Sequence, residues 1–169
     1  MRPILMCFIV LFLLSVPTTS VFADEIAIAV LDFELKDLTR TPITDDELER
    51  TASIKPLLNE TLSRKYSYQI AEVNSESKKN ADASVGYLFD HHNVAARLGQ
   101  DVGAEWVIVG RVHKASFLFV YFMVHVINAK TGQLVSDLIV EVKGPQRKLT
   151  IKGVEKLADQ IVETIQRRG

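Results

Sequence analysis

The sequence predicts an α/β domain built on a single mixed sheet of about five strands, parallel in its first half and an antiparallel meander in its second, with helices packed on it. Two patterns favour this fold class. Short apolar segments alternate with helical ones in the first half, and three strand-like segments joined by short loops follow before a last amphipathic helix. The composition, 47% hydrophobic and 24% charged, is that of a folded domain and excludes a disordered or collagen-like chain.

Residues 1–23 form a segment that we expect to lie outside the domain. A positive charge precedes an apolar run from Ile4 to Leu14, and the segment ends in Val21-Phe22-Ala23, which is typical of a signal peptidase site. The run is shorter than the ~20 residues that a membrane-spanning helix needs. We therefore predict a signal peptide cleaved after Ala23 and a single periplasmic domain over residues 24–169. After cleavage the protein should not be an integral membrane protein.

The first half of the domain should contain strands linked by helical crossovers, which makes its strands parallel. Residues 26–33 are apolar on both faces, as in a central strand, and a polar loop follows them. Thr44 and Glu47 have the spacing of a capping box, so a helix should begin there and run to about Arg64, with Pro56 kinking or splitting it. The remaining expected elements are a strand over 68–73, a turn or short helix over 74–83, and a helix over 94–102 that Asn93 caps and Gly103 ends.

The second half should form a meander of three strands over residues 105–113, 117–128 and 133–143, because the loops between them are short. Gly110 interrupts the first of these strands, where it either lets an aromatic ring or neighbouring backbone approach closely or marks a bulge. The last strand alternates apolar and charged residues, so one of its faces should be wet. An apolar stripe then predicts a closing helix from about Ile151 to Arg167.

Charge and cysteine content narrow the function classes. The net charge is −1, which argues against a nucleic-acid partner. The single cysteine, Cys7, lies in the predicted signal peptide, so the mature chain has no disulfide, thiol nucleophile or thiolate metal site. Charge is uneven: residues 24–60 carry ten acidic and four basic side chains, and residues 143–169 carry three acidic and seven basic. This asymmetry either solvates two faces or steers a partner, including a second copy.

Histidines provide the candidate ligand site. His91 and His92 are adjacent, Asp90 precedes them, and His113 and His125 lie on successive predicted strands. These side chains would converge on a metal or small ligand if the loop around Asp90 folded over the sheet. The alternative is that adjacent histidines point apart and are simply hydrogen-bonded in place, because no characteristic ligand spacing is present. We expect no cofactor.

Asp32 is the second candidate, because it lies at the carboxyl end of the first strand, where open α/β sheets place ligands. Its structural alternatives are to cap a loop or to pair with Arg111. No dinucleotide, phosphate-loop, nucleophile-elbow or zinc-protease motif is present in the sequence. We therefore predict that the protein is not an enzyme, with a hydrolase assembled from scattered Ser, His and Asp residues as the least supported alternative.

Several short motifs resemble a known group. Residues 27–33, Gly103-Ala-Glu-Trp-Val-Ile-Val-Gly110 and Asn128-Ala-Lys-Thr-Gly132 resemble the amino-terminal domain of the Tol-system propeller protein and the curli-secretion lipoprotein superfamily. The stretches 86–92 and 112–119 are similar to an uncharacterised family of small secreted bacterial domains. The chain departs from the curli-type lipoproteins because it lacks a lipidated cysteine and an obvious pair of barrel-forming hairpins, which argues against a secretion pore. No functional residue carries over from the resemblance.

The resemblance implies a non-enzymatic domain of the cell envelope that acts through protein–protein contacts. Its partner would be another envelope protein or a second copy of the chain. The alternative function is a periplasmic accessory protein that binds a small ligand or metal through the loop of Asp90, His91 and His92. The sequence names neither the partner nor the ligand.

Overall fold

The computed structural model describes residues 25–144 and 146–168, so the predicted signal peptide lies outside the described residues. One mixed sheet has the strand order β3–β1–β4–β5–β6, and β2 also pairs with β4. The strands are β1 (Ala27–Val30), β2 (Glu34–Asp37), β3 (Gln69–Ile70), β4 (Trp106–Lys114), β5 (Phe119–Asn128) and β6 (Leu134–Lys143). β1 runs parallel to β3 and β4, whereas β4, β5 and β6 are antiparallel. The predicted fold class is confirmed.

The first strand is interrupted, which the sequence pattern did not predict. We expected a strand over residues 26–33 followed by a loop, but the chain leaves the sheet after β1 and returns as β2, in register with Arg111 to Lys114 of β4. Between the two strands the Phe33 ring occupies the space over Gly110. A Cβ on that glycine would lie 2.6 Å from Cδ1 of Phe33 and nearer still to two other ring atoms. Of the alternatives for Gly110, the structure shows the close approach of an aromatic ring.

Six helices join or follow the strands in the described part of the chain. Their bounds are α1 (Asp45–Ala52), α2 (Ile54–Tyr66), α3 (Ser75–Ala81), α4 (Tyr87–Asp90), α5 (His92–Asp101) and α6 (Arg147–Gln166). The capping box is present: the Thr44 hydroxyl accepts from Glu47 N at 3.4 Å, and Glu47 Oε2 accepts from Thr44 N at 3.0 Å. α5 begins one residue before Asn93, so Asn93 is not its cap, whereas Gly103 has the expected positive φ of 72°.

Pro56 splits the predicted long helix into α1 and α2. It is the third residue of α2. Backbone N–H groups in the first turn of a helix have no acceptor within that helix, so proline costs no hydrogen bond there. In a continuous helix its ring would clash with the carbonyl of residue 52, which is the last residue of α1. The break at Ser53 avoids that clash.

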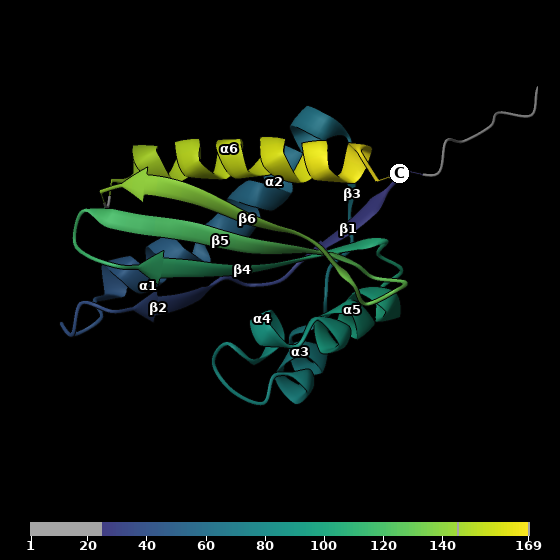
Figure 1. The fold of residues 1–169 in the computed structure, drawn as a ribbon, viewed down its shortest axis with the longest axis horizontal. Helices are drawn as coiled ribbons and strands as arrows, with labels where there is room; N and C mark the ends of the chain where they lie inside the picture. The colour runs from purple at the N-terminus through teal and green to yellow at the C-terminus, as the bar shows by residue number, and fades with distance from the viewer. Residues whose placement is uncertain (1–24, 145, 169) are drawn as a thin grey trace, which may run out of the picture.

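The helices cover the sheet unequally (Figure 1). α2 and α6 lie on one face, where the main core contains Ile108, Phe122 and the apolar stripe of α6 from Val154 to Ile165. α3, α4 and α5 lie beneath the opposite face, around Val107 and Leu98. They cover only part of that face. Ile139 of β6, on the uncovered part, is 52% exposed, which confirms that one face of the last strand is wet.

Candidate functional site

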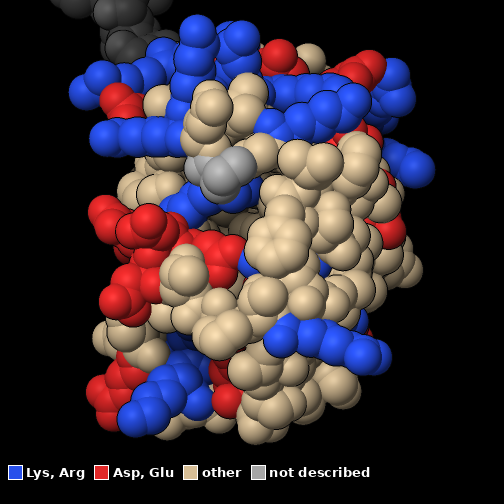
Figure 2. Space-filling model, turned by 90° about the vertical axis from the view of Figure 1, so that its left-hand side faces the viewer, with Lys and Arg blue, Asp and Glu red and all other residues tan. Residues whose placement is uncertain are grey.

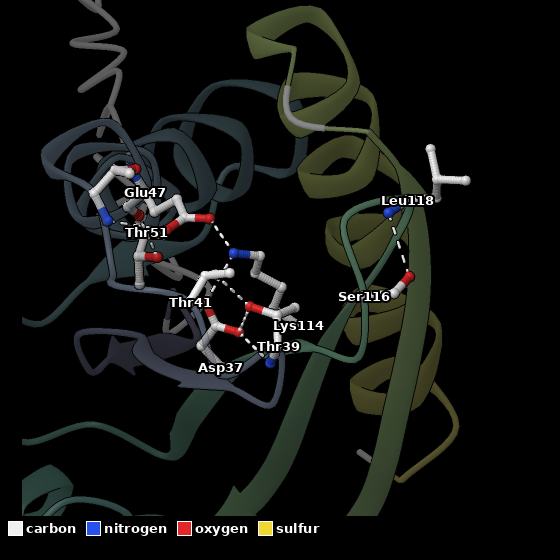
Figure 3. Close-up of polar contacts among 9 residues, drawn as sticks. Asp37, Thr39, Thr41, Glu47, Thr51, Lys114, Ser116 and Leu118 are labelled. Carbon is white, nitrogen blue, oxygen red and sulfur yellow. Dashed lines mark hydrogen bonds and ion pairs between the residues drawn. The ribbon is translucent and has the colours of Figure 1, made fainter.

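A buried lysine organises the end of the sheet where β4 turns into β5 (Figure 3). Lys114 is the last residue of β4, and its side chain is only 8% exposed. Its Nζ donates to Asp37 Oδ2 at 2.8 Å and to Glu47. Because Asp37 ends β2 and Glu47 caps α1, this single ammonium group joins three elements that are distant in the sequence.

The protonation states in this cluster are those of an ion pair. Burial raises the pKa of Asp37, but the hydrogen bonds from Lys114 and Thr39 outweigh that effect and bring it to about 2. The hydrogen bond from Lys114 is also the main reason that the pKa of Glu47 is lowered. Burial lowers the pKa of Lys114, but its two carboxylate partners overcome this and raise it. All three groups are therefore charged at neutral pH.

The loop after Lys114 and the first residue of β5 hold three apolar side chains in solvent. Ser116 Oγ accepts hydrogen bonds from Leu118 N at 3.3 Å and Phe119 N at 3.1 Å. The carbonyl of Leu118 accepts from Gly144 N at 3.2 Å, which ties the loop to the end of β6. Lys114 Nζ lies 5.3 Å from the centre of the Phe117 ring. The backbone of this loop is thus fixed while its apolar side chains stay exposed.

Exposed apolar side chains gather at this end of the molecule. The described residues include nine large apolar side chains that are exposed, and six of them lie here. Three follow β4, and three belong to the β2–α1 connection and α1, which Lys114 holds beside β4 through Asp37 and Glu47. We call this set the apolar end: Leu38, Ile43, Leu48, Phe117, Leu118 and Phe119. Such a concentration of exposed apolar surface is typical of an interaction site.

Charges of opposite sign border the apolar end along two different edges (Figure 2). Lys and Arg side chains gather along the upper edge, where α6 begins with Arg147 and Lys148. Asp and Glu side chains form a separate group to the left, and α1 begins with Asp45, Asp46 and Glu47. The charge asymmetry of the sequence therefore becomes two separate patches on one end of the fold.

The structure pairs Asp32 with two lysines that the sequence analysis did not single out. It does not pair with Arg111; instead its Oδ2 accepts from Lys78 of α3 at 3.0 Å, and its Oδ1 lies 3.5 Å from Lys55 of α2. Burial raises the pKa of Asp32, but hydrogen bonding and attraction from these lysines outweigh that effect and lower it. The contacts make Asp32 a link between helices on opposite sides of the sheet.

Arg111 and Asp90 do come together, beneath the partly covered face of the sheet. Arg111 is 13% exposed, its guanidinium lies 4.2 Å from the centre of the Phe89 ring, and its Nη2 is 4.0 Å from Asp90 Oδ2. Gly86 passes close by, since a Cβ there would lie 2.7 Å from the same Nη2. Glu34, which no sequence motif marked, accepts a hydrogen bond from Gly86 N at 2.5 Å. Arg111 thus fixes α4 against the sheet.

Two of the four histidines, His92 and His125, contact each other, and the other two have different neighbours. His91 stacks on Tyr87 with ring centres 4.0 Å apart, whereas His92 Nε2 lies 2.9 Å from Nδ1 of His125. The same Nδ1 lies 3.0 Å from the carbonyl oxygen of Phe89. His113 faces Tyr121 with ring centres 6.4 Å apart. Among the residues that the structure describes, no group of three His, Cys, Asp or Glu side chains is arranged to hold a metal ion.

The His92–His125 contact predicts a pH-dependent stability. Burial and the neighbouring His92 lower the pKa of His125 below its ordinary 6.5, despite the attraction of Asp137. The unfolded chain therefore takes up this proton more readily than the folded chain, so its contribution to stability is complete above pH 6.5 and is lost as the pH falls through the folded pKa. Urea midpoints should drop from pH 7.5 to pH 5.5. Compared with the original protein, the drop should be smaller in His125→Gln and the same in His91→Gln. An equal drop in all three proteins would show that His125 is not the cause of the pH dependence.

The fold is a small mixed α/β domain that exposes a group of large apolar side chains at one end of its sheet. The family model described as "Protein of unknown function (DUF2380)" matches residues 26–162, so the chain belongs to that family. This confirms the membership that the stretches 86–92 and 112–119 indicated. A search of curated proteins returns no significant match.

Solved structures with the same fold share little sequence with this chain. PelC from Paraburkholderia phytofirmans, solved as a dodecamer, has a TM-score of 0.53 and 14% identity over 84% of this chain and 88% of PelC. TolB from Acinetobacter baumannii has a TM-score of 0.52 and 15% identity over 83% of this chain and 28% of TolB. LpoB from Escherichia coli has a TM-score of 0.50 and 14% identity over 69% of this chain, which spans 56% of LpoB. The likeness to TolB confirms the predicted resemblance to the Tol-system protein.

No helix in the described residues is long and apolar enough to cross a membrane.

Proposed function

We propose that this chain is a non-enzymatic domain of the bacterial cell envelope that acts by binding another protein through its apolar end. The observation that carries the proposal is the concentration there of six of the nine exposed large apolar side chains in the described residues. Water exposure of so much apolar surface is unfavourable, and a protein partner that covers it gains most of its binding free energy from that burial.

The construction of this end supports a role in binding. The Ser116 hydroxyl and the Leu118 carbonyl fix the backbone of the β4–β5 loop, so its side chains are presented without a large ordering cost. The acidic and basic patches beside it would orient a partner of complementary charge. PelC, which has the same fold, assembles as a dodecamer, so self-association is the second form that this binding could take. The amino-terminal segment of the sequence supports an envelope location.

Replacing two residues of the apolar end with glutamate should strongly weaken the complex without unfolding the protein. Phe117 and Leu118 are 65% and 69% exposed, so the double substitution Phe117→Glu and Leu118→Glu should leave the melting temperature within about 2 °C of the original. Burying two carboxylates in an interface is costly, and the amount of co-purified partner or of oligomer should fall at least about tenfold. The measurement is native mass spectrometry of protein isolated gently from its own periplasm.

Val85 offers a matched control. It is 85% exposed, more than either Phe117 or Leu118, but it lies in the connection before α4 and outside the apolar end. Val85→Glu should leave the complex intact. The proposal fails if the protein is a monomer without companions, or if the two variants weaken the complex equally.

A further inference from the structure

The outer edge of β6 is long and regular. β6 is the last strand of the sheet, and no strand in the described part of the chain pairs with its outer side (Figure 1). Its pairing with β5 is continuous from Ser136 to Lys143, because the register shift between these strands lies before that run, at Val126 and Ile127. The run contains no proline. An edge strand of this kind is a template on which another strand can pair.

The hydrogen bond from Gly144 N to the carbonyl of Leu118, at 3.2 Å, fixes which backbone groups of β6 face outward. In an antiparallel pair, residues that bond to the neighbouring strand alternate with residues whose N–H and C=O point away from it. Because Gly144 bonds to β5, the residue before it and every second residue further back have their backbone groups at the outer edge. These residues are Asp137, Ile139, Glu141 and Lys143.

The same four residues have exposed side chains. Ile139, at 52% exposure, is one of three exposed large apolar side chains of the described residues that lie outside the apolar end. Lys143 Nζ lies 3.4 Å from Glu141 Oε1, and Asp137 Oδ1 lies 3.7 Å from Nε2 of His125. The edge therefore offers free backbone groups, an apolar side chain and charges of both signs.

We propose that β6 pairs antiparallel with β6 of a second copy of this chain, in the register that places Asp137 opposite Lys143 of the other copy. The pairing has two-fold symmetry about Val140, so every contact occurs twice. Ile139 lies opposite Glu141, and the joined edge gains about eight backbone hydrogen bonds, two in each of four residue pairs. This contact goes beyond the proposed function and uses no residue of the apolar end.

The order of charges selects this register. Charged side chains on an edge strand often discourage pairing. Here one neighbouring register places Asp137 opposite Glu141 of the second copy, and the other places Glu141 opposite its own equivalent. Like charges directly opposite each other on adjacent strands are destabilising, whereas opposite charges are stabilising. The proposed register avoids both repulsions and makes the two Ile139 side chains diagonal neighbours beside the axis.

Charge reversal tests the register. Sedimentation equilibrium should show a dimer with a dissociation constant of about 10–100 µM, as expected for a small interface. Asp137→Lys should weaken the dimer at least about tenfold, because it places lysines opposite each other on both sides of the axis. Adding Lys143→Asp inverts the pair and should recover most of the loss. Asp101→Lys, the same charge change at the exposed end of α5, is the control and should associate like the original protein.

Two substitutions at Ile139 test the backbone contact. Ile139→Pro removes an outward N–H, whereas Ile139→Thr makes the side chain smaller and keeps that N–H. Proline is tolerated where the N–H of an edge strand faces solvent, so both variants should stay folded. Urea unfolding at about 1 µM, where the monomer predominates, checks this. Ile139→Pro should weaken the dimer at least about tenfold, and Ile139→Thr should change it much less.

Three results would overturn the proposal: an original protein that stays monomeric at about 1 mM, a doubly reversed variant that associates no better than Asp137→Lys, or normal association of Ile139→Pro. The double substitution Phe117→Glu and Leu118→Glu separates this contact from the apolar end. It should leave the β6 dimer intact even where it removes a partner bound at the apolar end. Loss of the dimer in that variant would place the self-association at the apolar end and overturn the pairing of β6.

Discussion

Replacing Lys114 with methionine is expected to lower the free energy of unfolding by about 3–5 kcal/mol at pH 7, the range found when one partner of a buried ion pair is removed. The methionine keeps most of the volume but leaves Asp37, whose side chain is 5% exposed, without its cation. Because Lys114 also holds Glu47, the substitution loosens both β2 and α1. Urea denaturation followed by circular dichroism measures the loss.

The pH dependence of this loss identifies its cause. The pKa of Asp37 is lowered from 3.8 to about 2, so the ion pair stabilises the fold above pH 3.8 and this contribution disappears as the pH falls through about 2. The difference between Lys114→Met and the original protein should therefore shrink below pH 4. Adding Asp37→Asn to the methionine variant should recover part of the stability at pH 7, because the unpaired charge is removed.

Lys143 is the matched control for Lys114. It also pairs with a carboxylate, Glu141, at 3.4 Å, but its side chain is 75% exposed. Lys143→Met should change stability by less than about 0.5 kcal/mol. If Lys114→Met were equally mild, the cluster would not be the structural support of the apolar end.

Replacing Gly110 with valine should cost about 3 kcal/mol, the upper part of the range for overpacking. The valine would place its Cβ and methyl groups where the Phe33 ring lies. Phe33 is 6% exposed and has little room to move, so either the ring or β4 must shift. Thermal and urea unfolding report the loss, and the β1–β2 interruption is the part of the sheet that should loosen first.

A double-mutant cycle separates this clash from a general intolerance of valine in the strand. Phe33→Ala alone should destabilise the protein by emptying part of the core, but Gly110→Val in the Phe33→Ala background should cost much less than in the original chain. Gly103→Ala provides a comparison: its φ is 72° and no described atom lies within 4 Å of the position that a Cβ would take, so only backbone strain of about 1 kcal/mol is expected. Additive losses in the cycle would contradict the packing explanation.

Much of the fold could be predicted from local patterns. The alternation of β6, the short loops between β4, β5 and β6, and the apolar stripe of α6 are signals that depend on neighbours in the sequence. The capping box at Thr44 and the positive φ of Gly103 are also local, because each is set by backbone hydrogen bonds within a few residues. β2 was missed because Glu34 to Asp37 is polar and pairs with β4 only through tertiary contact.

The candidate site was less predictable, because its chemistry depends on distant partners. Adjacency in the sequence groups Asp90, His91 and His92, but successive side chains leave the backbone in different directions, and the structure gives them different neighbours. Lys114 lies in the family-like stretch 112–119, but nothing in that stretch marked it as a site residue. Its importance arises from the convergence of Asp37 and Glu47. The exposed Phe117-Leu-Phe119 segment resembles the start of a buried strand, since composition alone does not distinguish a covered from an uncovered apolar residue.

The sequence by itself indicated the family through short motifs. It determined the fold class and most of the order of helices and strands, because hydrophobic period, caps and turn residues act over a few neighbouring positions. It also indicated that charge was unevenly distributed along the chain. Only the tertiary structure decided that six exposed apolar side chains from two distant segments share one end, and that Lys114 is the buried group that joins those segments. These are properties of side chains brought together by packing, and their free energies depend on burial and distance rather than on position in the sequence.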